Sequence, residues 1–190
     1  TSSIVGGQGA DSLLLNDIRS GSSLLIAGDN VSRGVTDGGA DSIYLSGVIR
    51  TATVLGGAGN DSLTLGGLAG TSGVKVYMDG GNDLISAASK TNDLTDSHFY
   101  MGAGNDTFNI ALISGGKINS GSINLGKGSD TVSFAAGTEL TAAEVAGLTI
   151  NGGAGADYLL GGASLSASDT AEPIIQFTTS TDSTISAFDT

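Results

Sequence analysis

The chain contains no cysteine, no tryptophan, and only one histidine and one proline among its 190 residues. The absence of cysteine excludes disulfides, thiolate metal sites and a cysteine nucleophile. Because His98 is the only histidine, a zinc site built from several histidines is excluded, and a Ser-His-Asp triad would depend on this one residue. His98 alternates with an apolar Phe99 in a strand-like segment, so we expect it to face solvent. We therefore predict no catalytic residues and no enzymatic activity.

Basic residues are also scarce. The chain has 7 Lys and Arg against 19 Asp and Glu, which gives a formal net charge of −12. This balance argues against nucleic acid as a partner, because phosphates require clusters of Lys and Arg. Cations are the expected partners. No apolar run approaches the roughly 18 residues of a membrane span, so no span is predicted. The chain begins at Thr1 without a signal segment, and we expect a fragment or a processed product.

Glycine, in contrast, is abundant, with 32 residues. The segment from Gly56 to Leu65 shows how it is used, because six residues that favour a turn, GGAGND, are followed by SLTL. Glycine gives the turn backbone access to conformations with positive φ. Leu63 and Leu65 then alternate with Ser62 and Thr64, which is typical of a strand with one buried face. Ten residues thus predict a turn and a strand.

This six-residue turn recurs seven times, with glycine at its fourth position and aspartate at its sixth. The seven aspartates are Asp11, Asp41, Asp61, Asp83, Asp106, Asp130 and Asp157. The intervals between them are 30, 20, 22, 23, 24 and 27 residues, the length of one solenoid coil with two short strands. An apolar residue stands two places after each aspartate, and a second alternating segment precedes most turns, as in Val74, Val76 and Met78.

We therefore predict an all-β fold, a parallel β-roll or β-helix solenoid with one turn of this kind per coil. The repeats predict a domain of about seven coils over residues 1–165, and residues 166–190 are expected to supply strands that cap the stack or lead to a further domain. A helical turn is a possible alternative to a loop near residues 141–145. Leu24 to Ala27 followed by Gly28-Asp29-Asn30 indicates a strand and a degenerate turn, and we expect Asp29 to matter less for stability than Asp61.

The turns offer hard oxygen ligands. Stacking two turns brings two carboxylates and several carbonyls around one gap, which suits calcium better than magnesium or zinc. Aspartates on strands about 4.8 Å apart would also repel one another without a cation. Seven turns leave six gaps, and six divalent ions would carry +12 against the net charge of −12. Asp37 and Asp79, at the second turn position, would add carboxylates to their gaps.

The turns and the strands that follow them resemble the G-G-x-G-x-D-x-U-x repeats of the RTX (repeats-in-toxin) family of secreted calcium-binding proteins. The resemblance implies a parallel β-roll, type I secretion and folding driven by about six calcium ions. It also implies that the seven aspartates are side-chain ligands and that the turn glycines supply carbonyls. These glycines are Gly7, Gly9, Gly39, Gly57, Gly59, Gly81, Gly102, Gly104, Gly126, Gly128, Gly153 and Gly155. The longer coil with one motif departs from the family pattern and predicts a single file of ions.

Two functions remain open at this level. The first is a structural or interaction module of a bacterial surface-layer or adhesin-type protein, located outside the cell, whose partners are copies of itself or a cell-surface glycan or protein. The second is the calcium-dependent carboxy-terminal domain of an RTX enzyme or toxin. An ice-binding face at the turns would require a ladder of threonines, and the third turn position carries Gln8, Lys127 and small residues instead.

Overall fold

A computed structural model describes the chain over residues 2–16, 24–29, 38–68, 71–89, 94–112, 118, 120–134, 147–160, 174–176 and 184–186. Within these residues the secondary structure consists of strands, turns and bends, without a helix. The segment 141–145, for which a helical turn was one of two alternatives, lies outside the described residues.

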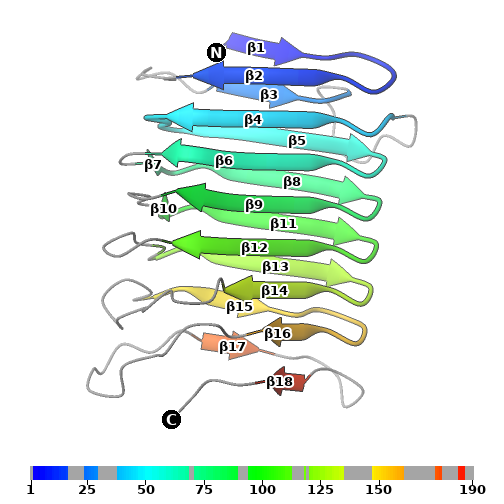
Figure 1. The fold of residues 1–190 in the computed structure, drawn as a ribbon, viewed down its shortest axis with the longest axis vertical. Coiled ribbons are helices and arrows are strands. Elements are labelled where there is room, and N and C mark those ends of the chain that lie inside the picture. Colours follow the sequence, from blue (N-terminus) through cyan, green and yellow to red (C-terminus); the bar gives the residue numbers. More distant parts are fainter. Residues whose placement is uncertain are drawn as a thin grey trace.

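Two eight-stranded parallel sheets run along the molecule (Figure 1). The first contains, in spatial order, β1 (Ser2–Val5), β3 (Leu24–Ala27), β5 (Ala52–Ala58), β8 (Lys75–Gly80), β11 (His98–Ala103), β13 (Ser122–Lys127), β15 (Thr149–Asn151) and β17 (Ile174–Gln176). The second contains β2 (Ser12–Asn16), β4 (Ser42–Gly47), β6 (Ser62–Leu68), β9 (Leu84–Ser89), β12 (Thr107–Leu112), β14 (Thr131–Phe134), β16 (Tyr158–Leu160) and β18 (Thr184–Ser186). A short third sheet pairs β7 (Thr71–Ser72) with β10 (Leu94–Thr95).

The chain alternates between the two large sheets, which makes it a parallel β-solenoid. Each of the seven repeat aspartates ends a connection from a strand of the first sheet to the next strand of the second, and these connections lie along one edge, to the right in Figure 1. We call this the motif edge. The opposite edge carries the connections of variable length. The predicted fold class is confirmed. β17 and β18 pair in parallel with β15 and β16, so both sheets continue beyond residue 165.

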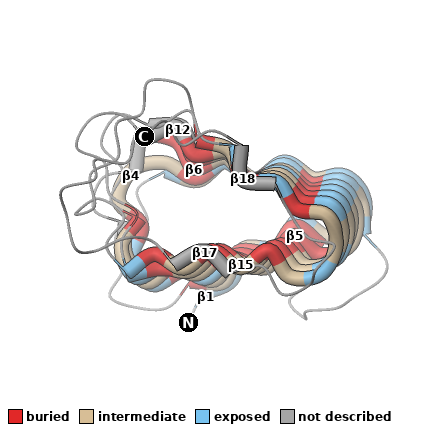
Figure 2. Tube along the Cα trace, turned by 90° about the horizontal axis from the view of Figure 1, so that it is seen from below, coloured by how far each residue is buried: buried red, intermediate tan, exposed pale blue. Residues whose placement is uncertain are grey.

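Alternate side chains of both sheets fill one continuous core. Figure 2 shows buried residues along both facing sheets. Phe99 of β11 and Phe108 of β12 meet across it with ring centroids 4.9 Å apart and planes at 82°, an edge-to-face contact. Both rings are fully buried. The alternation of apolar and polar residues in the sequence therefore correctly predicts which face of these strands is buried. Ile4, Leu13 and Leu15 of the first coil are only partly buried against this core.

The second coil departs from the predicted register. β3 pairs with β5 so that Ala27 faces Leu55, which aligns Gly28 and Asp29 with the first two positions of the third turn. The second turn thus begins at Gly28-Asp29 and resumes at Gly38 to end on Asp41. The predicted strand from Leu24 is confirmed, but Asp29 belongs to the main turn. Thr36 and Asp37, predicted at the first two positions, lie outside the described residues.

The fourth turn position requires glycine for two reasons. Gly81 has φ of +135°, where a side chain is strained. A methyl group on Gly81 would also collide with the carbonyl oxygen of Gly59 in the preceding turn. The adjacent Gly80 has neither restriction, because a methyl group there would meet its nearest atom, the carbonyl oxygen of Ala103, at 4.0 Å. From the second turn onward, the turns stack too closely for any side chain at this position.

We predict that Gly81→Ala destabilises the fold by roughly 2–4 kcal/mol, from backbone strain and overpacking together. Gly80→Ala is the matched control and should change the free energy of unfolding by less than about 1 kcal/mol. Denaturant unfolding of both variants in one buffer measures the difference. Equal midpoints for the two variants would contradict the close stacking of the turns.

Candidate metal centre

The seven turn aspartates form one continuous ladder along the motif edge. The backbone N–H of each aspartate donates to Oδ1 of the aspartate in the next coil. The donor to acceptor distances are 2.8 Å from Asp11 to Asp41, from Asp41 to Asp61, from Asp61 to Asp83 and from Asp83 to Asp106, 2.7 Å from Asp106 to Asp130, and 3.1 Å from Asp130 to Asp157. The sequence analysis placed these residues in a file, and the structure brings them together. We call them the aspartate ladder.

The carboxylates point inward and are removed from water. From Asp41 to Asp157 every member of the ladder is at most 2% exposed. Oδ1 accepts the N–H bond in each aspartate from Asp41 onward, but Oδ2 is buried without a hydrogen-bond partner in Asp11, Asp41, Asp61, Asp83, Asp106 and Asp130. A buried, unsatisfied carboxylate oxygen is costly in a folded protein. This row of oxygens therefore calls for a proton or a cation beside it.

Burial raises the pKa values of five consecutive ladder carboxyls, from Asp41 to Asp130, because it penalises their charged form. Desolvation is the largest cause in each case and the backbone hydrogen bond opposes it. The pKa of Asp61 rises to about 6, that of Asp83 to about 8 and that of Asp130 to about 7. The pKa of Asp106 rises to about 6, and that of Asp41 is also raised. Neighbouring aspartates add to the shift, as Asp106 and Asp61 do for Asp83.

The backbone around the ladder supplies further oxygens. Carbonyls of the fourth-position glycines lie between successive turns: a methyl group on Gly104 would collide with the carbonyl oxygen of Gly81, and one on Gly128 with that of Gly104. The carbonyls of Gly102 and Gly126 lie in the same way against the following turns. The predicted glycine carbonyls are therefore close to the gaps between turns. The carbonyls that border Oδ2 itself belong to the first turn position: a methyl group on Gly6 would meet both Asp11 Oδ2 and the Gly28 carbonyl oxygen, and one on Gly56 both Asp61 Oδ2 and the Met78 carbonyl oxygen. Carboxylate and carbonyl oxygens are hard ligands of the kind that calcium takes.

The first turn position decides how much space adjoins each carboxylate. Beside Gly6 and Gly56, a methyl group would stand 2.8 Å from Oδ2 of Asp11 and 2.7 Å from Oδ2 of Asp61, so glycine keeps this space open. In the next three turns this position is taken by apolar residues that are at most 2% exposed. They are Met78, Met101 and Leu125. The gaps are therefore chemically unequal along the stack.

A second ladder runs along the motif edge in the opposite direction. The N–H of Asn82 donates to Oδ1 of Asn60 at 2.7 Å, that of Asn105 to Oδ1 of Asn82 at 2.7 Å, and that of Ser129 to Oδ1 of Asn105 at 2.8 Å. These side chains are exposed at the fifth turn position. The sequence analysis missed this ladder, although asparagine at that position in three successive turns is a signal for it.

Two carboxylates stand at the second turn position. Asp79 faces Gly57 across the β5–β8 pair, and its charge contributes to the raised pKa of Asp83. Asp29 is its counterpart in the second turn and is 6% exposed. Its burial was not anticipated from the sequence. Nowhere in the described residues do three or more His, Cys, Asp or Glu side chains gather as a metal cluster, so a cation at the motif edge would take much of its shell from carbonyls and water.

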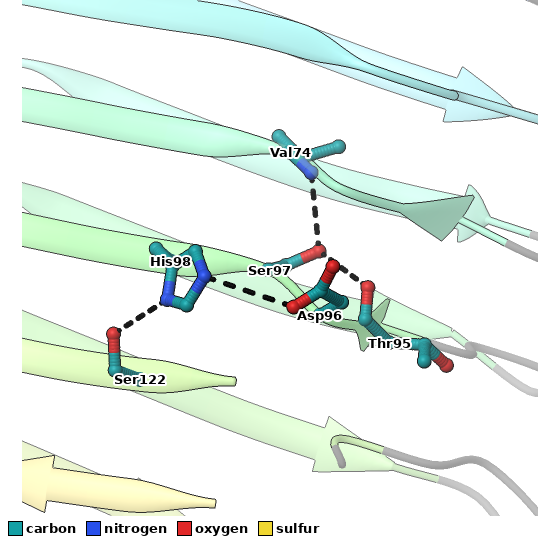
Figure 3. Close-up of polar contacts among 6 residues, drawn as sticks. All are labelled: Val74, Thr95, Asp96, Ser97, His98 and Ser122. Atoms are coloured by element: carbon teal, nitrogen blue, oxygen red, sulfur yellow. Dashed lines mark hydrogen bonds and ion pairs between the residues drawn. The ribbon is translucent and has the colours of Figure 1, made fainter. Parts of the chain in front are cut away.

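His98 lies outside the motif edge, in a small polar group on the outer face of the first sheet (Figure 3). Its Nδ1 is 2.8 Å from Oγ of Ser122, and its Nε2 is 3.8 Å from Oδ1 of Asp96, whose side chain is 72% exposed. The expected outward orientation of His98 is confirmed by a side chain that is 33% exposed. At 3.8 Å, Asp96 does not hydrogen-bond the imidazole and so does not fix its orientation.

Comparisons with known proteins returned no matching family model, no matching curated protein and no matching solved structure. The resemblance to RTX repeats stays a prediction based on the turn sequences. No helix in the described part of the chain has the length and apolar character needed to cross a membrane.

We predict that the cation-free protein loses stability as pH rises. The folded-state pKa values lie above the ordinary 3.8, so between about pH 4 and 8 the folded chain binds more protons than the unfolded chain. The free energy of unfolding therefore falls through this window. With chelator present, Tm should drop by several degrees between pH 5 and pH 8, since each kcal/mol corresponds to about 2–4 °C for a chain of this size.

Asp83→Asn removes the carboxyl with the pKa of about 8 and should flatten this dependence. Asp96→Asn removes one charge from an exposed side chain and serves as the control, with an unchanged slope. A chelated protein whose Tm rises over the same pH range would show that these carboxyls are not desolvated as described.

Proposed function

We propose that the chain is a calcium-dependent structural and interaction module of a secreted bacterial surface protein, of surface-layer or adhesin type. The observation that carries the proposal is the row of buried Oδ2 atoms of the aspartate ladder. From Asp41 to Asp130, each belongs to a carboxylate with one oxygen bonded to the preceding coil and the other buried without a hydrogen-bond partner. Calcium in the gaps between turns would supply the missing positive charge.

Calcium fits this donor set better than other divalent ions. It takes six to eight oxygens at about 2.3–2.6 Å in a flexible geometry, so one carboxylate, carbonyls and water can share a shell. Magnesium demands a tight octahedron, and zinc prefers the sulfur and nitrogen ligands that a chain with no cysteine and one histidine lacks. The ladder residues and the carbonyls of the turn glycines would hold the ion, as the sequence predicts.

In this mechanism the protein holds the oxygen ligands in place. The Oδ1 bond of each aspartate fixes its carboxylate against the preceding coil, the fourth-position glycine lets the turns approach, and the core beneath excludes water. A bound ion would neutralise the charge of these carboxylates, and its binding energy would add to the folding energy. Such a chain would fold where calcium is abundant, at the millimolar concentrations to which extracellular modules respond.

The outer face of the second sheet supports the interaction role. Hydroxyl groups repeat along it in register, as in Ser12, Ser42 and Ser62. Large apolar side chains are exposed on the same face, and a solenoid repeats such a surface from coil to coil. These exposed residues are Leu14, Tyr44, Leu84, Tyr158 and Leu160. This face suits self-association or a cell-surface glycan or protein.

We predict that calcium at 100 times its dissociation constant stabilises the chain by about 2.7 kcal/mol for each independent site, because the ion binds only the folded state. Thermal unfolding monitored by circular dichroism, with chelator and with calcium, measures the gain. Magnesium at the same concentration is the control and should give a much smaller shift. The proposal fails if chelator and calcium give the same melting curve.

We further expect Asp61→Asn to lower the calcium stoichiometry. The asparagine Oδ1 can still accept the N–H of Asp41, so the fold should persist while the carboxylate is lost. Metal content per chain, measured by mass spectrometry, should fall by at least one ion, and Asp96→Asn should leave it unchanged. Loss of metal from both variants alike would point to a non-specific charge effect.

A further inference from the structure

Asp29 is the most unusual carboxylate of the motif edge, because it lies outside the repeat pattern and is nevertheless 94% buried, with an exposed fraction of 6%. It occupies the second position of the second turn, where the third turn has Gly57. Its Oδ1 accepts the N–H of Gly39 at 3.2 Å. Its Oδ2 is buried and has no hydrogen-bond partner.

Asp29 lies just before the start of a backbone ladder that joins the turns from the third onward. In four coils, the N–H at the fourth turn position donates to the third-position carbonyl of the next turn, at 2.9 Å each time. These bonds join Gly59 to Gly80, Gly81 to Ala103, Gly104 to Lys127 and Gly128 to Ala154. In the second turn the equivalent N–H, that of Gly39, donates to Asp29 instead of reaching the carbonyl of Ala58.

The Ala58 carbonyl oxygen is therefore left facing a carboxylate oxygen. A methyl group on Gly38 would collide with both Oδ2 of Asp29 and the carbonyl oxygen of Ala58, so the two oxygens border one small space. A methyl group on Gly57 would stand 2.6 Å from the same Oδ2. Both oxygens are acceptors only, and two acceptors that face each other repel unless a proton or a cation lies between them. The negative charges of Asp41 and Asp61 nearby strengthen the demand for a cation.

We propose that Asp29 Oδ2 and the Ala58 carbonyl oxygen bind a calcium ion between the second and third turns, at a site additional to the aspartate ladder. The inference rests on the proposed function for the identity of the ion. Glycines at positions 38 and 57 leave the room, and water completes the shell, as calcium accepts. In the later coils the fourth-position N–H joins one turn to the next through a carbonyl. Here the ion would make that link, by binding the Ala58 carbonyl oxygen of the third turn together with Asp29 of the second.

Asp29→Asn tests the site. The amide Nδ2 can donate to the Ala58 carbonyl while Oδ1 still accepts the Gly39 N–H, so the variant replaces the ion by a hydrogen bond. Titration of the whole chain with calcium, followed by native mass spectrometry, should show one ion fewer per chain than the wild type. With chelator present, the variant should melt at a higher temperature than the wild type. Asp96→Asn, the charge-matched control, should show neither change.

The outcomes separate this inference from the proposed function. If the wild type binds several ions and Asp29→Asn binds the same number, the Asp29 site is wrong and the aspartate ladder stands. If the wild type binds a single ion that Asp29→Asn loses, the Asp29 site stands and the ladder is not filled. A wild type that binds no calcium overturns both. An Asp29→Asn protein that does not fold, by circular dichroism in calcium, contradicts the exchange of ion for amide.

Discussion

The fold depends on how each coil is attached to the next at the motif edge. An aspartate N–H finds its acceptor on the aspartate of the following coil, which commits one carboxylate oxygen and leaves the other buried. This arrangement fixes the register of both sheets, because the aspartate is followed directly by a strand of the second sheet. It also concentrates negative charge in the one place where the core meets the turns. The same hydrogen bonds therefore set the strand register and hold the buried negative charges in place.

The architecture was predictable because its determinants are local. Glycine at the fourth turn position, aspartate at the sixth and apolar residues two and four places later are sufficient to place turn, strand and buried face, as Ile43, Leu63 and Phe108 show. The parallel pairing follows from the coil length. The alignment of seven aspartates in one file also follows from the repeat alone.

Other features could not be read from the sequence because they depend on contacts between coils. The sequence predicts Asp37 at the second position of the second turn, but the register of β3 on β5 puts Asp29 at that position. Which oxygen of each carboxylate is bonded, and where the Ala58 carbonyl points, depends on the approach of neighbouring backbones. The asparagine ladder had a visible signal, three asparagines at the fifth position, whose meaning required the spacing between turns.

Both edges of the solenoid accept changes in chain length. Successive aspartates are separated by as few as 20 and as many as 30 residues, yet the strands of both sheets stay in register. The longest interval, from Asp11 to Asp41, includes the eight residues between Asp29 and Gly38, within the connection from β3 to β4 at the motif edge. The other intervals differ in the connections that lead from the second sheet back to the first. A protein built this way can gain new segments at either margin, and so change what it recognises, while keeping the same framework.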